Sequence, residues 1–287
     1  MSVELIDFNG DNGFFALKVR NQYAEAEIWN RGAQVIHYRK NGGMPVLWHA
    51  PDAQPQKDVP TRAGVPFCFP CFGGRPGDPE MPFHGFAWLS CWKLEECRIT
   101  NDEEDVIVWS LTPEMVAPEW RRWDFAARMT ITVGAELKIC CEIRNDSGEE
   151  QDLEFGFHTY YRVSEFSRIA LKGLQGERWL DRQSGEEILQ QSPSIPGGTA
   201  LLQFYSPSAA PVVIEDPGAG RCIRVSKEGL PATMIFHPAP AETSPDPAAG
   251  WVAVESLNAG KGRIPLPAGG TLTGILTVSE ESREVQS

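Results

Sequence analysis

Basic residues are scarce in this sequence compared with acidic ones. Its 287 residues include 26 lysines and arginines against 39 aspartates and glutamates, which gives a net charge of −13 and a pI of about 4.9. Nucleic acids and anionic membrane surfaces are polyanions, so this balance argues against both as partners. A small phosphorylated ligand is still compatible with the acidic total, because a local group of arginines is enough to bind one phosphate.

Long apolar runs are also missing. Nowhere do 18 apolar residues follow one another, so we expect no membrane-spanning helix. The N-terminal segment MSVELIDFNG has no basic start followed by an apolar stretch, so we expect no secretion signal. The cysteines number seven, and an odd count in a chain of this size indicates free thiols in a reducing compartment. Together these absences predict a cytoplasmic protein.

Helical periodicity is a third absence. No long stretch keeps apolar residues at helical spacing, whereas alternation with a period of two recurs along the chain. Residues 129–143, MTITVGAELKICCEI, alternate up to Val133, turn at Gly134 and alternate again from Leu137. This pattern predicts a hairpin with one apolar face.

Further strand-like segments follow at short intervals, with 27 glycines and 23 prolines concentrated between them. They are 23–29, 105–112, 153–163, 167–172, 200–205, 211–215, 221–225, 232–236, 251–256 and 271–278. Many short strands with such turns indicate an antiparallel β-sandwich. We expect one domain over residues 1–280 and a polar tail over 281–287. The irregular stretches 49–85 and 237–250 are expected to help form a site, since long loops in a compact sandwich are usually functional.

The first candidate site lies in RAGVPFCFPCF (62–72) and PFHGFAW (82–88). Its aromatic side chains suit stacking on a sugar ring, with Arg62 and His84 as hydrogen-bonding groups. A buried loop stiffened by proline has the same composition, so that alternative stays open. The Cys-x-x-Cys spacing in the first segment matches redox and zinc motifs only weakly, and buried inert thiols are the preferred interpretation.

A polar stripe marks the strand-like segment 155–163, FGFHTYYRV. Alternation places His158, Tyr160 and Arg162 on one side of this strand. Polar side chains on an otherwise apolar strand must face solvent or a cleft. A lone strand histidine is more often structural than catalytic, so the two polar neighbours are what make His158 a candidate.

Glu255 in WVAVES (251–256) is the candidate carboxylate. Alternation places it on the same side as Trp251 and Ala253. A carboxylate in so apolar a run is costly to bury without hydrogen-bonding partners, and buried carboxylates have the raised pKa values that suit a general base. A surface glutamate on an edge strand is the alternative.

Taken together, these segments resemble the aldose 1-epimerase (galactose mutarotase-like) superfamily, most closely its glucose-6-phosphate 1-epimerase, or hexose-6-phosphate mutarotase, branch. The likeness follows the family's order over nearly the whole chain, and the HTYYRV and HGFA segments are its more specific parts. The matching segments are RAGVPFCFPCFG (62–73), PFHGFA (82–87), Trp92 with the strand after it, GFHTYYRVSEFSRIALKGLQG (156–176), LDR (180–182), VVIEDPGAGRCIRV (212–225) and VAVES (252–256).

The resemblance implies a β-supersandwich with few short helices and with no metal or organic cofactor. It also implies that His158 protonates the ring oxygen of a sugar while Glu255 takes the proton from the anomeric hydroxyl. The implied activity is interconversion of the α and β anomers of an aldose or a hexose 6-phosphate. A non-catalytic carbohydrate-binding or regulatory protein on the same scaffold is the alternative. A glycoside hydrolase ranks last, because hydrolysis normally uses two carboxylates.

The expected sugar-contacting side chains are Arg62, His84, Trp88, Tyr160 and Arg162, of which Arg62 and His84 match substrate-contacting positions of the family. The family usually has an arginine at the place of Trp88, where it helps to hold a phosphate. This departure leaves the choice between a sugar and a sugar phosphate open.

Two further departures concern the same sugar-binding set. Phe83 stands where the family often has glutamine, and 202–205 contains no binding aspartate. The candidates for a replacement cation are Arg75, Arg121, Arg122 and Arg162.

Overall fold

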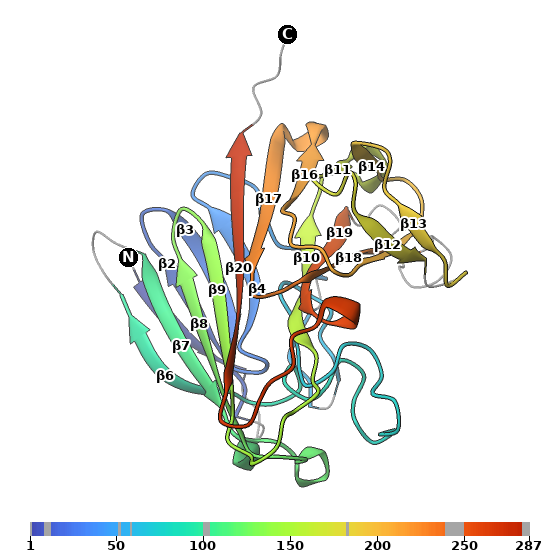
Figure 1. Ribbon diagram of the computed structural model, residues 1–287. Helices are drawn as coiled ribbons and strands as arrows, with labels where there is room; N and C mark the ends of the chain where they lie inside the picture. The colour runs from blue at the N-terminus through green and yellow to red at the C-terminus, as the bar shows by residue number, and fades with distance from the viewer. Residues whose placement is uncertain are drawn as a thin grey trace.

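Three antiparallel sheets make up the molecule (Figure 1). The computed structural model describes residues 2–8, 13–50, 53–57, 59–99, 104–181, 184–238 and 250–282. The nine-stranded sheet has the order β14 (Ser194–Pro196), β11 (Ala170–Lys172), β16 (Val212–Asp216), β17 (Arg221–Glu228), β20 (Thr271–Ser282), β9 (Leu137–Asn145), β8 (Phe125–Val133), β7 (Asp105–Leu111) and β6 (Lys93–Arg98). The seven-stranded sheet has the order β13 (Glu187–Leu189), β12 (Arg178–Asp181), β15 (Leu201–Tyr205), β18 (Ala232–His237), β19 (Trp251–Asn258), β10 (Phe155–Arg162) and β5 (Phe67–Cys68). The four-stranded sheet runs from β1 (Ser2–Asp7) through β2 (Phe15–Arg20) and β3 (Ala24–Trp29) to β4 (Gln34–Lys40).

The predicted fold class, an antiparallel all-β sandwich with few short helices, is confirmed. The helices of the described residues are single 3₁₀ turns: η1 (Pro113–Met115), η2 (Pro118–Trp120), η3 (Phe166–Arg168), η4 (Pro217–Ala219) and η5 (Gly260–Gly262). In this part of the chain no helix is long and apolar enough to cross a membrane.

The hairpin predicted over 129–143 is confirmed as β8 and β9. Val133 pairs with Leu137 across the turn, and the alternating side chains Met129, Ile131 and Val133 are at most 1% exposed. Their neighbours on the other side of β8 are partly exposed. The apolar face of this hairpin is therefore buried in the core, as the period of two required.

Two sequence expectations differ from the structure. The first half of 167–172 is the 3₁₀ turn η3 rather than a strand, and only Ala170–Lys172 pairs in the sheet. Strand β4 was not apparent from alternation, because four of its seven residues are buried and both of its faces contribute to them. A strand covered on both sides lacks the contrast on which period-two patterns depend.

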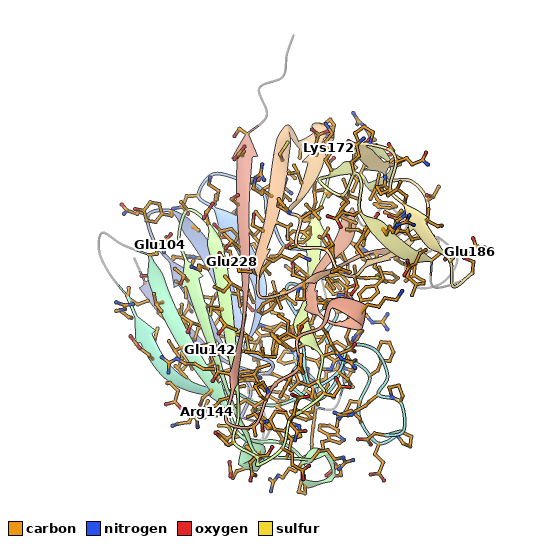
Figure 2. All side chains as sticks on the ribbon, viewed as in Figure 1. Glu104, Glu142, Arg144, Lys172, Glu186 and Glu228 are labelled. Carbon is orange, nitrogen blue, oxygen red and sulfur yellow. The ribbon has the colours of Figure 1, made fainter. Side chains whose placement is uncertain are left out.

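One hydrophobic core draws side chains from all three sheets. Leu17 and Ile28 come from the four-stranded sheet, Ile131 from the nine-stranded sheet, and Phe157 and Val254 from the seven-stranded sheet. Figure 2 shows side chains filling the space between the sheets. Because Phe157 and Val254 are buried in this core, their neighbours in β10 and β19 project from the opposite face of the seven-stranded sheet.

Arg221 ties the sheets together through a buried ion cluster. The guanidinium is 3% exposed and donates to Glu280 Oε1 at 2.7 Å, to the Arg162 carbonyl at 2.7 Å and to the Pro45 carbonyl at 3.0 Å. Asp216, which is fully buried, lies 3.9 Å from its Nε. The cluster holds the end of β10 against β17 and β20.

We expect Arg221→Met to lower the free energy of unfolding by about 3–5 kcal/mol, because it leaves buried carboxylates without their cation. Urea denaturation measures the change. Arg224→Met is the matched control, since Arg224 is exposed on the same strand and should shift stability by at most about 0.5 kcal/mol. Equal effects of the two substitutions would contradict a stabilising role for the cluster.

Candidate functional site

His158 and Glu255 lie side by side on adjacent strands of the seven-stranded sheet. They are register partners of β10 and β19, and His158 Nε2 lies 3.2 Å from Glu255 Oε1. His158 is 8% exposed and Glu255 1% exposed. Strand pairing thus brings an imidazole and a carboxylate from distant parts of the chain into hydrogen-bonding distance.

The alternation of each strand determines which face carries this pair. In β10, Phe157 and Tyr161 enter the main core, whereas His158 and Tyr160 point away from it with their rings stacked at 4.8 Å. In β19, Val254 enters the same core. The polar stripe expected from the sequence therefore lies on the face of the sheet that is turned away from the core.

Burial lowers the pKa of the His158 imidazole, and the positive charge of Arg62 acts in the same direction, so that the pKa falls from 6.5 to about 4. The nearby Glu255 carboxylate acts in the opposite direction, since a negative charge at 3.2 Å favours imidazolium. Burial also raises the pKa of Tyr160, with Glu255 as the next cause, so its phenol stays neutral.

His84 is held against His158 by a strained loop. The two rings meet edge to face at 5.3 Å, and His84 has φ +66°, a conformation that few residues other than glycine adopt. The ring nitrogen Nδ1 of His84 accepts a hydrogen bond from the backbone N–H of Gly73 at 3.0 Å. The backbone N–H of His84 donates to the Gly73 carbonyl at 2.8 Å. In the neutral ring, this leaves the proton on Nε2.

Trp88 packs behind His84. Its ring lies edge to face with His84 at 5.6 Å, and its indole N–H donates to the Gly85 carbonyl at 2.9 Å. Trp88 is 5% exposed. The structure therefore places the residue that replaces the family's usual arginine as a support for His84.

Arg62 reaches the pair from the segment that runs beside β10. The carbonyl of Gly64 accepts from Tyr160 N at 2.8 Å, and that of Pro66 accepts from His158 N at 2.9 Å. Gly64 has φ +54°, and a Cβ there would lie 2.0 Å from the Val35 carbonyl oxygen, so only glycine fits. The exposed Arg62 lies close enough for its charge to act on both His158 and Tyr160.

Aromatic side chains continue the face beyond the pair, and the sequence analysis had not singled out Trp48, Phe236 or Trp251 as site residues. Trp251 lies 5.3 Å from the Tyr160 ring, 5.4 Å from Trp48 and 6.1 Å from Phe236. Arg162, the register partner of Trp251, is exposed at the end of β10. The signal for Phe236 and Trp251 was available, because each lies next to a core residue, Ile235 or Val252, in its own strand.

Two of the arginines considered as replacement cations are already engaged elsewhere. Arg122 binds Asp78 at 3.1 Å, and Arg121 donates to the carbonyls of Val116 and Glu114, both at 2.9 Å. Both arginines line a separate surface pocket of about 800 Å³. The lining residues of that pocket do not include His158 or Glu255.

The surroundings of Cys68 and Cys71 do not favour metal binding or redox chemistry. Cys68 and Cys71 are buried and not joined by a disulfide. Burial raises the pKa of both thiols, that of Cys71 to about 11, so neither is a ready nucleophile. Among the described residues, no group of three or more histidine, cysteine, aspartate or glutamate side chains is placed to hold a metal ion.

Comparisons with known proteins match nearly the whole chain. A family model described as aldose 1-epimerase matches residues 16–279. The protein named "Putative glucose-6-phosphate 1-epimerase" of Cenchrus ciliaris is 25% identical over 232 residues, covering 74% of this chain and 67% of its own. The protein of the same name from Escherichia coli strain K12 is 27% identical over 226 residues, covering 78% and 74%.

Solved structures share the fold. The crystal structure of a "putative mutarotase" from Salmonella typhimurium superimposes with a TM-score of 0.85 at 21% identity, covering 98% of this chain and 94% of that one. The structure of galactose 1-epimerase from Lactobacillus acidophilus NCFM gives a TM-score of 0.73 at 11% identity, covering 99% and 100%. At these identities the likeness establishes the architecture.

The lowered pKa of His158 predicts acid sensitivity. Between pH 6.5 and about 4 the unfolded chain binds a proton at this residue and the folded chain does not, so the free energy of unfolding should fall as the pH drops through this window. The loss attributable to His158 is on the order of 3 kcal/mol. Urea denaturation of the wild type and His158→Gln at pH 7, 6, 5 and 4 isolates it, and parallel pH profiles would contradict the lowered pKa.

Proposed function

Because this chain belongs to the aldose 1-epimerase family, we propose that it interconverts the α and β anomers of an aldose by opening and reclosing the sugar ring. The observation that carries the proposal is the 3.2 Å contact between His158 Nε2 and Glu255 Oε1 on the face of the sheet turned away from the core. A base and a proton donor placed side by side meet the needs of this reaction at one hemiacetal carbon.

The chemistry follows from moving one proton between two oxygens. Glu255 takes the proton of the C1 hydroxyl, the bond between C1 and the ring oxygen breaks, and C1 becomes a carbonyl. His158 gives a proton to the ring oxygen that leaves. Rotation about the C1–C2 bond turns the other carbonyl face towards that oxygen, and the reverse transfers close the ring as the other anomer.

Direct contact between His158 and Glu255 allows both groups to return to their starting protonation states after each ring opening. Over one ring opening, a proton leaves O1 and a proton arrives at the ring oxygen, so the pair gains and loses nothing. Burial keeps the resting His158 imidazole neutral, so the proton that Glu255 receives passes over the 3.2 Å contact to His158 and forms the imidazolium. That imidazolium is more acidic than usual and gives its proton to the developing alkoxide, which returns both groups to their starting state.

The side chains around His158 and Glu255 are suited to bind the sugar. His84 stands against His158 with its tautomer set by Gly73, so it is suited to donate from Nε2 to a sugar hydroxyl. Arg62 supplies positive charge near the pair, and Tyr160 supplies a neutral phenol. Arg162 extends this set at the end of β10. Trp88 acts through His84 by packing behind its ring.

Glu255→Gln should reduce the rate of anomerisation at least about 100-fold, because the amide keeps the shape of the side chain and cannot accept the proton. Polarimetry of freshly dissolved α-D-glucose and of glucose 6-phosphate measures the rate. Glu142→Gln is the matched control, since Glu142 lies on β9 of the nine-stranded sheet (Figure 2). Wild-type rates in Glu255→Gln would refute the assignment, and sugar binding without acceleration by the wild type would favour a non-catalytic protein.

His84→Asn should raise KM about tenfold and change kcat by less than about threefold, as expected for a group that binds substrate and transition state alike. Asparagine tolerates the positive φ, and its side-chain oxygen can accept from Gly73 N in place of Nδ1. Steady-state kinetics separate the two constants. An unchanged KM would contradict a substrate-contacting role for His84.

A further inference from the structure

The face that carries the acid–base pair continues as an apolar strip across the seven-stranded sheet. Glu255 is the register partner of Met234 on β18, Met234 pairs with Phe204 on β15, and Phe204 pairs with Leu180 on β12. Residues that pair directly in adjacent antiparallel strands project from the same face. One row of side chains therefore runs from the pair towards the edge of the sheet.

A second row runs beside the first. Tyr160 pairs with Ala253, Ala253 with Phe236, and Phe236 with Leu202. Exposure rises along it: Ala253 is fully buried, Phe236 is half-buried and Leu202 is 36% exposed. Water therefore reaches the strip increasingly with distance from the catalytic pair.

Charge is confined to the two ends of the strip. Beyond Glu255 the two rows consist of Met234, Phe204, Leu180, Ala253, Phe236 and Leu202, none of which is charged. The next charged group along the first row is Glu187 on β13, which pairs with Leu180 and forms a salt bridge with Lys261. A phosphate group needs cations or several donors, and the strip offers neither.

The dimensions of the strip fit a second sugar ring. Neighbouring strands lie about 4.8 Å apart, so Leu202 lies two strands, or roughly 10 Å, from Ala253. The C–H faces of a pyranose pack on apolar and aromatic side chains while its hydroxyl groups stay in water. A group attached at C1 is not a suitable occupant, because a glycoside has no free C1 hydroxyl to be deprotonated.

We infer that the preferred substrate is a saccharide of two or more rings whose second ring is uncharged. Its reducing ring binds at His158 and Glu255, and the next ring lies over Phe236 and Leu202. The inference rests on the proposed function, because only the reducing ring carries the free anomeric hydroxyl on which the pair acts.

Polarimetry with glucose, glucose 6-phosphate, maltose and cellobiose tests this substrate class. We expect kcat/KM for at least one disaccharide to exceed that for both glucose and glucose 6-phosphate about tenfold. We also expect Leu202→Ser to lower the ratio of disaccharide to glucose kcat/KM about fivefold or more, because it removes apolar surface under the second ring.

Ile188→Ser is the matched control. Ile188 is 37% exposed and belongs to the same sheet, but it pairs with Trp179, which packs against the core from the other face. The ratio of disaccharide to glucose kcat/KM in Ile188→Ser should equal that of the wild type. Acceleration of glucose or its phosphate without a disaccharide preference, or equal ratios in both variants, would overturn the inference alone. Failure to accelerate any of the four sugars would overturn the proposed function as well.

Discussion

The pairing of β10 with β19 is the constraint on which the site depends. It places His158 opposite Glu255 in register, and because both side chains point away from the core, it turns both groups to the same face. A slip of one residue would move either group into the apolar core. The core side chains Phe157 and Val254 therefore do more than stabilise the sheet: by being buried, they determine which face their neighbours occupy.

Keeping an imidazole and a carboxylate almost fully buried is costly, and the surroundings offset the cost in separate ways. Each group is the other's partner at 3.2 Å. The segment beside β10 receives the backbone N–H groups of His158 and Tyr160, so the strand has no unsatisfied edge there. Gly64 makes that close approach possible, and the same segment brings Arg62 close to the pair.

Several parts of this arrangement were predictable from local pattern. Alternation in 129–143 gave the β8–β9 hairpin, and alternation in 155–163 gave the faces of His158 and Tyr160. Strand β4 was missed because both its faces contribute buried residues, and the first half of 167–172 proved to be a 3₁₀ turn that its composition does not distinguish from a strand. The supporting place of Trp88 behind His84 depends on a left-handed backbone that no residue preference at position 84 suggests.

By itself, the sequence determined the acidic balance, the antiparallel all-β class and the side of each strand on which its polar residues lie, because these follow from composition and from the two-residue repeat of a strand. Tertiary structure alone decided that His158 meets Glu255, that Arg62 stands near them, and that an apolar strip leads from them across β18 and β15. These are relations between strands far apart in the chain. They depend on sheet order and register, which arise only when all the strands pack on one core.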